Sequence, residues 1–383
     1  MSEQVVQRTD CRLFDGYRPC RPGRTCPGCS HYDPVQGEVL IINLDALGDV
    51  LRTTAQLPAL RRAWPRARIS WLTRTRAVPL LQGHPLLDRV IPLDLEAVLE
   101  LQARRFDLML CVDKGRAAGG LATTLRAHAK RGFALDEHGV IVPLNPQAAY
   151  LYRTGLDDQL KFERNTLSEP AMLAQAFNLP WDREPYRLVL ADDERVGPPR
   201  AVGFNTGSSA AWPRKRLEPG LLAEALLAVH RAVGQPVLLL GGPEDRERNE
   251  ALATQLGPAV ELTPTDAGLR VGAAQVARCE VVFSGDSLGM HMALAVGCHV
   301  VAWFGPTCPQ EIDLFDRGIK LLAAVDCAPC WRAGCAREPA CNTQLAPELI
   351  LCAVLDCLEA RRAGRALDEI RGAGWWPVPG VAR

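Results

Sequence analysis

Short apolar runs and amphipathic stretches alternate along most of this chain. In the first half, the apolar runs have the length of buried strands and lie at 38–43, 68–73, 90–92 and 107–112. The stretches between them carry apolar residues at helical spacing, at 49–64, 78–81 and 96–103. Strands and helices that alternate at these distances are typical of βαβ units and a parallel sheet. We therefore predict a Rossmann-like α/β domain over residues 38–185.

The same alternation restarts after a segment rich in proline and charge, residues 180–199, which we expect to link two domains. Beyond it, strands are expected at 201–205, 236–240, 260–262, 281–284 and 300–304. Helices are expected at 221–232, 246–256, 271–277, 290–296 and 346–362. The pattern thus predicts a second doubly wound unit over 200–345, followed by a C-terminal helix and tail over 346–383.

The composition is that of an ordinary globular protein, and the length allows two full cores. Of the 383 residues, 48% are hydrophobic, and 44 Lys and Arg balance 44 Asp and Glu. This balance leaves no overall field that would attract nucleic acid or an anionic membrane. No apolar run approaches the ~20 residues that cross a bilayer, and the first residues do not resemble a signal peptide. We expect a cytoplasmic protein, with peripheral association at the inner face of the cytoplasmic membrane as an alternative.

Fourteen cysteines are many for such a chain, and eight of them fall into two groups of four. Without an export signal, grouped cysteines bind a metal more often than they form disulfides, although disulfides and free thiols remain alternatives. Each group contains a CxxC pair, whose spacing lets two thiolates hold one zinc or iron ion. One group lies in a head, residues 1–37, and the other lies at 327–341. The predicted ligands are Cys11, Cys20, Cys26, Cys29, Cys327, Cys330, Cys335 and Cys341.

One turn of the second domain has the features of a phosphate site. Residues 284–291, Ser-Gly-Asp-Ser-Leu-Gly-Met-His, join an apolar run to a helix. Such a turn presents free backbone N–H groups and the positive end of a helix dipole, although an ordinary loop would read the same way. The loop at 205–209 offers glycine and hydroxyl groups, with Lys215 and Arg216 positioned to neutralise a diphosphate. Glu244, after the next strand, can accept hydrogen bonds from a ribose or a base.

Ligands of open α/β sheets bind at the carboxyl ends of the strands, so two such domains would enclose a ligand between them. Asp49, at the start of the first long helix, can take a proton from an acceptor hydroxyl or simply cap its helix. The first turn lacks the glycines of GxGxxG, which argues against an NAD-dependent dehydrogenase. The arginine-rich head leaves RNA binding as a weaker alternative.

Four motifs in the right order over residues 38–316 resemble glycosyltransferase family 9. They are the stretch 39–50, the segment 203–217 with Trp-Pro-Arg-Lys-Arg, the turn Gly-Gly-Pro-Glu, and the stretch 284–297 followed by Phe-Gly-Pro-Thr. The resemblance implies a GT-B fold, in which two Rossmann-like domains face a central cleft. It also implies an inverting enzyme that moves a heptose from an ADP-sugar to a hydroxyl of a lipopolysaccharide core, a glycan or a protein. The cysteine group at 327–341 is similar to the iron-binding motif of bacterial autotransporter heptosyltransferases.

The resemblance makes Asp49 the general base, and Lys215 would stabilise the charge on the leaving diphosphate. No catalytic metal is needed in this scheme, so the metals at the cysteine groups would be structural. Leu288 stands where the family usually has glycine, which leaves the donor sugar open. Together with the extra cysteine head it motivates an alternative, a metal-stapled or metal-sensing sugar-nucleotide-binding protein of the same fold without turnover. The predicted donor-binding residues are Thr206, Gly207, Ser208, Lys215, Arg216, Gly242, Glu244, Asp286, Ser287, Leu288, Gly289 and His291.

Overall fold

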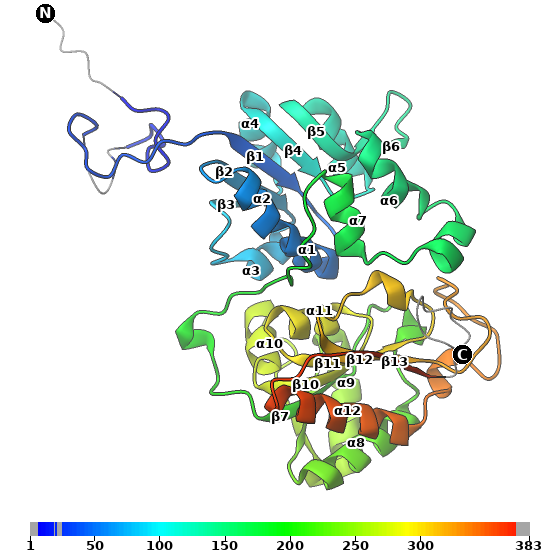
Figure 1. Ribbon diagram of the computed structural model, residues 1–383. Coiled ribbons are helices and arrows are strands. Elements are labelled where there is room, and N and C mark those ends of the chain that lie inside the picture. The colour runs from blue at the N-terminus through cyan, green and yellow to red at the C-terminus, as the bar shows by residue number, and fades with distance from the viewer. Residues whose placement is uncertain (1–6, 19, 21–24, 373–383) are drawn as a thin grey trace, which may run out of the picture.

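Two α/β domains stand one above the other in the computed structural model (Figure 1). The structure describes residues 7–18, 20 and 25–372, so part of the predicted head and the end of the predicted tail lie outside the described residues. The chain passes from the first domain to the second through the predicted linker, which is extended apart from a short 3-10 turn at Asp192–Glu194. The predicted α/β class with two Rossmann-like domains is confirmed.

The first domain is built on a six-stranded sheet in the order β3-β2-β1-β4-β5-β6, parallel except for the antiparallel pair of β5 and β6. Its strands are β1 (Glu38–Ile42), β2 (Arg68–Thr73), β3 (Arg89–Pro92), β4 (Arg105–Cys111), β5 (Arg126–Leu135) and β6 (Ile141–Pro143). Its helices are α1 (Leu47–Thr53), α2 (Leu57–Ala63), α3 (Val78–Leu81), α4 (Leu95–Ala103), α5 (Arg116–Thr124), α6 (Ala149–Arg153) and α7 (Glu169–Ala176), with a π-helical turn at Leu160–Arg164.

The second domain is built on a seven-stranded parallel sheet in the order β13-β12-β11-β10-β7-β8-β9. Its strands are β7 (Ala201–Asn205), β8 (Val237–Leu240), β9 (Val260–Leu262), β10 (Cys279–Gly285), β11 (His299–Phe304), β12 (Arg317–Leu322) and β13 (Leu367–Gly372). Its helices are α8 (Pro219–Val233), α9 (Arg246–Leu256), α10 (Leu269–Val276), α11 (Leu288–Ala295) and α12 (Pro347–Arg362).

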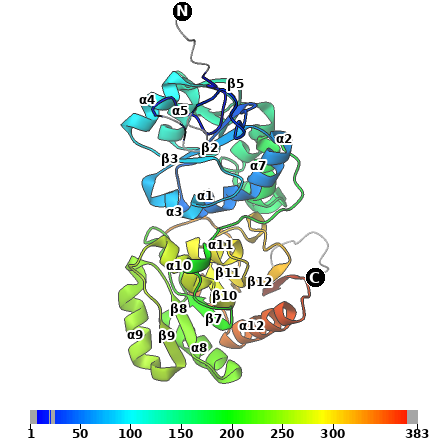
Figure 2. The same cartoon turned by 90° about the vertical axis from the view of Figure 1, so that its left-hand side faces the viewer.

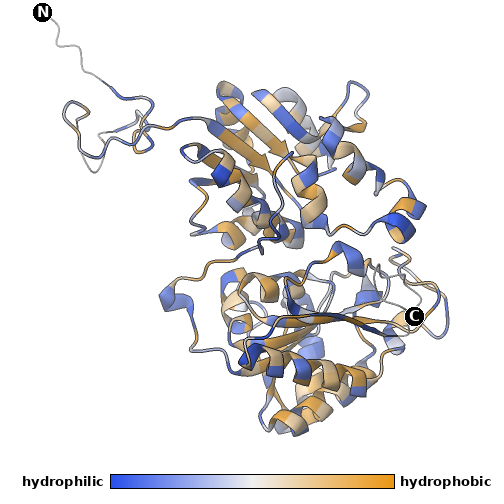
Figure 3. Ribbon diagram, viewed as in Figure 1, coloured by the Kyte–Doolittle hydropathy of each residue, from blue (hydrophilic) through white to orange (hydrophobic). Residues whose placement is uncertain are grey.

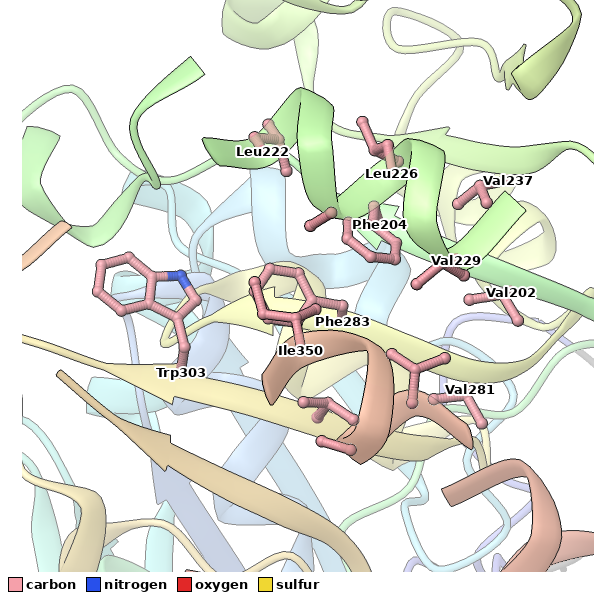
Figure 4. Packing of buried hydrophobic residues seen from close by; sticks show 14 of the residues in the cluster. Val202, Phe204, Leu222, Leu226, Val229, Val237, Val281, Phe283, Trp303 and Ile350 are labelled. Carbon is pink, nitrogen blue, oxygen red and sulfur yellow. The ribbon is translucent and has the colours of Figure 1, made fainter. Parts of the chain in front are cut away.

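Helices cover both faces of each sheet, which explains why the central strands are apolar along most of their length. Figure 3 shows this as hydrophobic colour along the central strands of both domains. On one face of the second sheet, α8 and α12 pack over Phe204, Phe283 and Trp303 (Figure 4). The ring centroids of Phe204 and Phe283 lie 4.8 Å apart. This core fixes β7 and β10, the two strands that carry the candidate donor loops.

The other face of the second sheet lies under α10 and α11, and this cluster extends into the first domain. It includes Leu51 from α1 and Leu80 from α3, both fully buried. The turned view shows α1 and α3 facing α11 and α10 across the domain boundary (Figure 2). The two domains are therefore held together by an apolar contact at one end of the cleft.

The C-terminal region differs from the expectation of a separate helix and tail. The expected helix is α12, but β13 follows it and pairs in parallel with β12. Residues 347–372 therefore complete the second sheet and its helical layer. No helix in the described part of the chain is long and apolar enough to span a membrane.

The described part of the head packs against the first domain mainly through Arg12. Its guanidinium pairs with Asp33 at 3.1 Å and with Asp88, and it donates a hydrogen bond to the carbonyl oxygen of Arg66 at 3.2 Å. Cys11 is buried beside this contact and forms an isolated bridge with Pro34. The head is thus fixed on the side of β2, away from the carboxyl ends of the strands.

Candidate functional site

A cavity of about 950 Å³ lies between the two domains. The first domain lines it with residues of α1, of the turn after β4 and of α7, and the second domain lines it with the loops after β7, β8 and β10. The carboxyl ends of parallel strands from both sheets therefore meet at one space, which is where doubly wound sheets bind their ligands.

The turn after β10 holds a charged pair at the cavity wall. The Nζ atom of Lys215 lies 3.1 Å from Oδ2 of Asp286, and the two side chains are only 17% and 13% exposed. Burial alone would raise the pKa of Asp286, but the adjacent Lys215 ammonium outweighs it. The pKa therefore lies below its usual value and the carboxylate stays ionised. Asp286 thus fixes the position of a cation that reaches into the cavity.

Asn205 ties the loop after β7 to the turn after β10. Its side-chain Nδ2 donates hydrogen bonds to Ser284 Oγ at 3.0 Å and to Ser287 Oγ at 2.9 Å. Gly289 allows this approach, because a Cβ atom there would lie 2.4 Å from Asn205 Cγ. The two loops predicted to bind a diphosphate therefore form one connected surface at the start of α11.

Ten of the twelve residues predicted to bind the donor line the cavity; they are Gly207, Ser208, Lys215, Gly242, Glu244, Asp286, Ser287, Leu288, Gly289 and His291. The other two lie behind its wall. Thr206 Oγ1 donates a hydrogen bond to Asn249 Oδ1 at 2.5 Å, and Arg216 donates to the carbonyl oxygen of Ser208. Thr206 and Arg216 therefore brace the loop, and donor contact by the ten others stays a prediction.

Asp49 lines the same cavity from the first domain, and its carboxylate is 43% exposed. Its Oδ2 accepts a hydrogen bond from the backbone N–H of Ala46 at 3.1 Å, so it also caps α1. Its Oδ1 lies 2.5 Å from Nη2 of Arg52, which also lies 2.5 Å from Glu169 Oε2. Asp49 therefore caps its helix and also faces the cavity, and its role as the acceptor of a proton stays a prediction.

Arg52 and Glu169 line the cavity and were not predicted from the sequence, whereas Asp113 does not line it but supports the turn beside it. Arg52 is buried between two carboxylates, and burial raises the pKa of Glu169 to about 7 despite the Arg52 charge. Asp113 follows β4, and its carboxylate accepts hydrogen bonds from Asn43 Nδ2 at 2.6 Å and from the backbone N–H of Leu44. Asp113 thereby fastens the turn that leads to α1. A carboxylate directly after an apolar strand was the one signal in the sequence that could have identified it.

His291 lies where the two domains touch. It is 5% exposed, and burial lowers its pKa to about 4, so the ring is neutral at pH 7. Its Nδ1 and the Tyr186 hydroxyl are hydrogen-bonded at 3.1 Å. A Cβ atom at Gly48 of α1 would lie 2.8 Å from His291 Cδ2, so α1 and α11 approach each other closely at this point.

The cysteine groups stay predictions as metal sites. All fourteen cysteines are free thiols in the structure. Over residues 7–18, 20 and 25–372, no three or more His, Cys, Asp or Glu side chains are arranged so that they could hold a metal ion. In the second group, burial and then the nearby thiols of Cys330, Cys335 and Cys327 raise the pKa of Cys341 to about 11.

Comparison with known proteins places this architecture in a family. The sequence model of glycosyltransferase family 9 (heptosyltransferase) matches residues 100–341. No curated protein matches the chain. The glycosyl transferase family 9 structure from Veillonella parvula DSM 2008 shares 19% identity with a TM-score of 0.67, covering 84% of this chain and 97% of that one. ADP-heptose lps heptosyltransferase II from E. coli shares 16% identity with a TM-score of 0.60, covering 85% and 99%.

A third similar structure is the iron-containing dodecameric glycosyltransferase TibC from enterotoxigenic E. coli H10407. It shares 14% identity with a TM-score of 0.53, covering 87% of this chain and 81% of that one. At these identities the structures demonstrate a common fold, that of two-domain glycosyltransferases. The family match itself spans more than half of the residues. Fold, cleft and sequence match agree, and the chain belongs to glycosyltransferase family 9, the heptosyltransferases.

Proposed function

We propose that this protein is an inverting glycosyltransferase that moves a heptose or a related sugar from an ADP-sugar to a hydroxyl group. The acceptor would be a lipopolysaccharide core, a glycan or a protein. One observation carries the proposal: Asp49 of the first domain and the Lys215–Asp286 pair of the second line one cavity. A carboxylate opposite a fixed cation is what transfer from a sugar nucleotide needs, since one removes a proton and the other receives the leaving charge.

The second domain would bind the donor. The diphosphate would lie against Lys215, Ser208 and the backbone N–H groups at the start of α11, where the helix dipole favours an anion. Glu244 lines the cavity after β8 and would accept hydrogen bonds from the ribose or the base. The E. coli heptosyltransferase WaaC has been solved with ADP, and TibC in complex with ADP-D-beta-D-heptose. We propose the same class of donor here.

The first domain would bind the acceptor, and Asp49 would take the proton from its hydroxyl group. Arg52 holds this carboxylate from one side, which leaves it directed toward the cavity. Attack from the first domain, opposite the leaving diphosphate on the second, would invert the anomeric carbon. Lys114 also lines this side of the cavity, and its amine would suit an acidic group on the acceptor.

We further propose a structural zinc or iron ion at one or both four-cysteine groups. The CxxC spacing within each group supports this, as does the likeness of fold to the iron-containing TibC. Thiolates are the ligands that both metals accept, and neither ion has a catalytic step in the proposed transfer. We propose that the protein acts in the cytoplasm, with the inner face of the cytoplasmic membrane as the place where a lipid-linked acceptor would be met.

A donor screen by mass spectrometry, with elemental analysis of the same sample, tests the proposal. Wild-type protein should transfer heptose from ADP-heptose or release ADP from it. Asp49→Ala should abolish turnover while the dissociation constant for ADP stays within about twofold, because the carboxylate acts on the acceptor. Loss of ADP affinity with turnover preserved would contradict the role of Asp49.

A second candidate is a sugar-nucleotide-binding protein without turnover, favoured by Leu288, whose side chain lines the cavity where the family turn usually has glycine. ADP binding by the wild type, together with neither transfer nor hydrolysis across the donor screen, would establish that function instead.

A further inference from the structure

The second cysteine segment, residues 327–341, forms part of the cleft wall through Trp331. This tryptophan lines the cavity and is 42% exposed. The backbone N–H groups of Trp331 and Cys330 both donate to the carbonyl oxygen of Pro306, at 2.8 and 3.2 Å. These bonds anchor the segment to the turn after β11. The φ angle of Trp331 is 51°, a left-handed conformation that a side-chain-bearing residue keeps only where its surroundings hold it.

The same segment contacts the donor loop, residues 206–216, at two points. The rings of Trp331 and Trp212 meet edge to face, with centroids 5.4 Å apart. Arg214 donates a hydrogen bond to the carbonyl oxygen of Cys335 at 3.2 Å and another to Asn342 Oδ1 at 3.1 Å. Lys215, the proposed diphosphate ligand, directly follows Arg214, and its Nζ lies 5.2 Å from the centre of the Trp212 ring.

Trp331 also faces the first domain. The Nζ atom of Lys161, on the π-helical turn before α7, lies 4.0 Å from the centre of the Trp331 ring. The same amine pairs with Glu311 of the second domain at 2.8 Å. Trp331 therefore stands between the donor loop on one side and a domain-bridging ion pair on the other.

The donor loop depends on such outside contacts, because it contains little regular structure of its own. Its only helical turn is the 3-10 turn Pro213–Lys215. Its internal hydrogen bonds join residues close in sequence, such as the Trp212 N–H to the Ser209 carbonyl oxygen at 2.9 Å and the Arg216 side chain to the Ser208 carbonyl oxygen. Any further ordering of the loop on ligand binding weakens affinity unless neighbouring groups have already fixed it. The cysteine segment provides such neighbours through Trp331 and the carbonyl oxygen of Cys335.

We propose that the segment Cys327–Cys341 holds the donor loop in its binding conformation and that Trp331 is the positioning residue that connects the two. The proposal rests on the proposed function, since it takes Lys215 as the ligand of a nucleoside diphosphate. It gives the cysteine segment a role in donor affinity besides its structural one. Trp331 acts on the diphosphate through Trp212 and Lys215, so its removal should affect donor binding more than folding.

Titration calorimetry with ADP on the full-length protein tests this inference. Trp331→Ala should weaken ADP binding about tenfold, because the loop must then be ordered at the expense of binding. Trp331→Phe should stay within about twofold of the wild type, since phenylalanine keeps the edge-to-face contact. Both variants should also unfold thermally at a midpoint near that of the wild type, which would show that they remain folded.

A double-mutant cycle separates positioning from direct contact. Arg214→Gln removes the second attachment of the loop, so with Trp331→Ala it should weaken binding by less than the product of the two single effects. A full product would show that Trp331 acts independently of the loop attachment, and would overturn the inference. Equal affinity of Trp331→Ala and wild type would overturn it as well, while leaving the proposed function intact. A wild-type protein that does not bind ADP would instead overturn the proposed function, and the inference with it.

Discussion

Asp113→Asn should remove a loss of stability that the wild-type protein undergoes as the pH rises from about 4 to about 7. Burial raises the pKa of Asp113 to about 7, whereas its ordinary value is 3.8. Its carboxylate accepts hydrogen bonds from Asn43 and from the backbone of Leu44, and it carries a charge that the folded protein must bury. Asparagine has nearly the same shape, keeps one acceptor oxygen and has no charge to bury.

The sign follows from which state binds the proton more tightly. Since the pKa is higher in the folded protein, the favourable contribution of protonated Asp113 is complete below about pH 4 and is lost as the pH rises to about 7. The difference between about 7 and 3.8, at about 1.36 kcal/mol per pKa unit, corresponds to about 4 kcal/mol of unfolding free energy. The asparagine variant cannot ionise at this position, so it should not lose this free energy of unfolding as the pH rises.

The assay is urea unfolding followed by tryptophan fluorescence at pH 4 and at pH 8, for wild type and variant. The unfolding free energy of Asp113→Asn minus that of the wild type should be about 4 kcal/mol larger at pH 8 than at pH 4. Asp158→Asn serves as the control, because Asp158 is an exposed carboxylate of the same domain. Parallel pH dependence of Asp113→Asn and wild type would refute the reasoning that the hydrogen bonds to Asp113 do not offset the cost of burying its charge.

Three further substitutions test other parts of the structure. Lys215→Met should weaken ADP binding about thirtyfold by calorimetry, since it removes a charge-assisted contact to the diphosphate; unchanged affinity would exclude Lys215 from the donor site. Cys330→Ser should lower both the metal content and the thermal midpoint, and an unchanged metal-to-protein ratio in elemental analysis would argue against a metal at the second cysteine group. Gly132→Ala should destabilise the protein by about 3 kcal/mol, because φ is 96° and a Cβ atom would lie 1.9 Å from the carbonyl oxygen of Cys111. Gly139→Ala, where φ is 75° but no atom lies within 4 Å, should cost only about 1 kcal/mol, and equal losses in thermal unfolding would contradict the close contact.

The elements that could be predicted from the sequence are those whose own side chains form a buried layer. The strand expected at 68–73 and the helix expected at 246–256 have the bounds of β2 and α9. By contrast, β5 begins with Arg126-Ala-His-Ala-Lys, a polar run that forms a strand because β4 pairs with it along its length. β13 is similar, since of Leu367-Asp-Glu-Ile-Arg only Leu367 is buried, and its pairing with β12 defines the strand. Pairing between segments distant in the chain has no local signature.

The same distinction applies to the candidate site. Loops with glycine, hydroxyl and basic residues after strands could be found from the sequence, because phosphate binding requires those groups at one strand end. The ion pair between Arg52 and Glu169 could not, since the two residues are separated by more than a hundred positions and meet only in the folded protein. Thr206 and Arg216 were predicted to bind the donor because a hydroxyl group and a guanidinium group suit a phosphate. Their side chains instead form hydrogen bonds within the second domain and brace the loop.

The two domains can approach each other closely at Gly48 and His291 because Gly48 has no side chain. At this point α1 and α11 meet where a methyl group would lie 2.8 Å from the imidazole ring. A larger residue at position 48 would press on His291, one of the predicted donor-binding residues, and so on the contact between the two domains. Position 48 therefore offers a place to vary the separation of α1 and α11, and with it the width of the cleft, by steps of a single carbon.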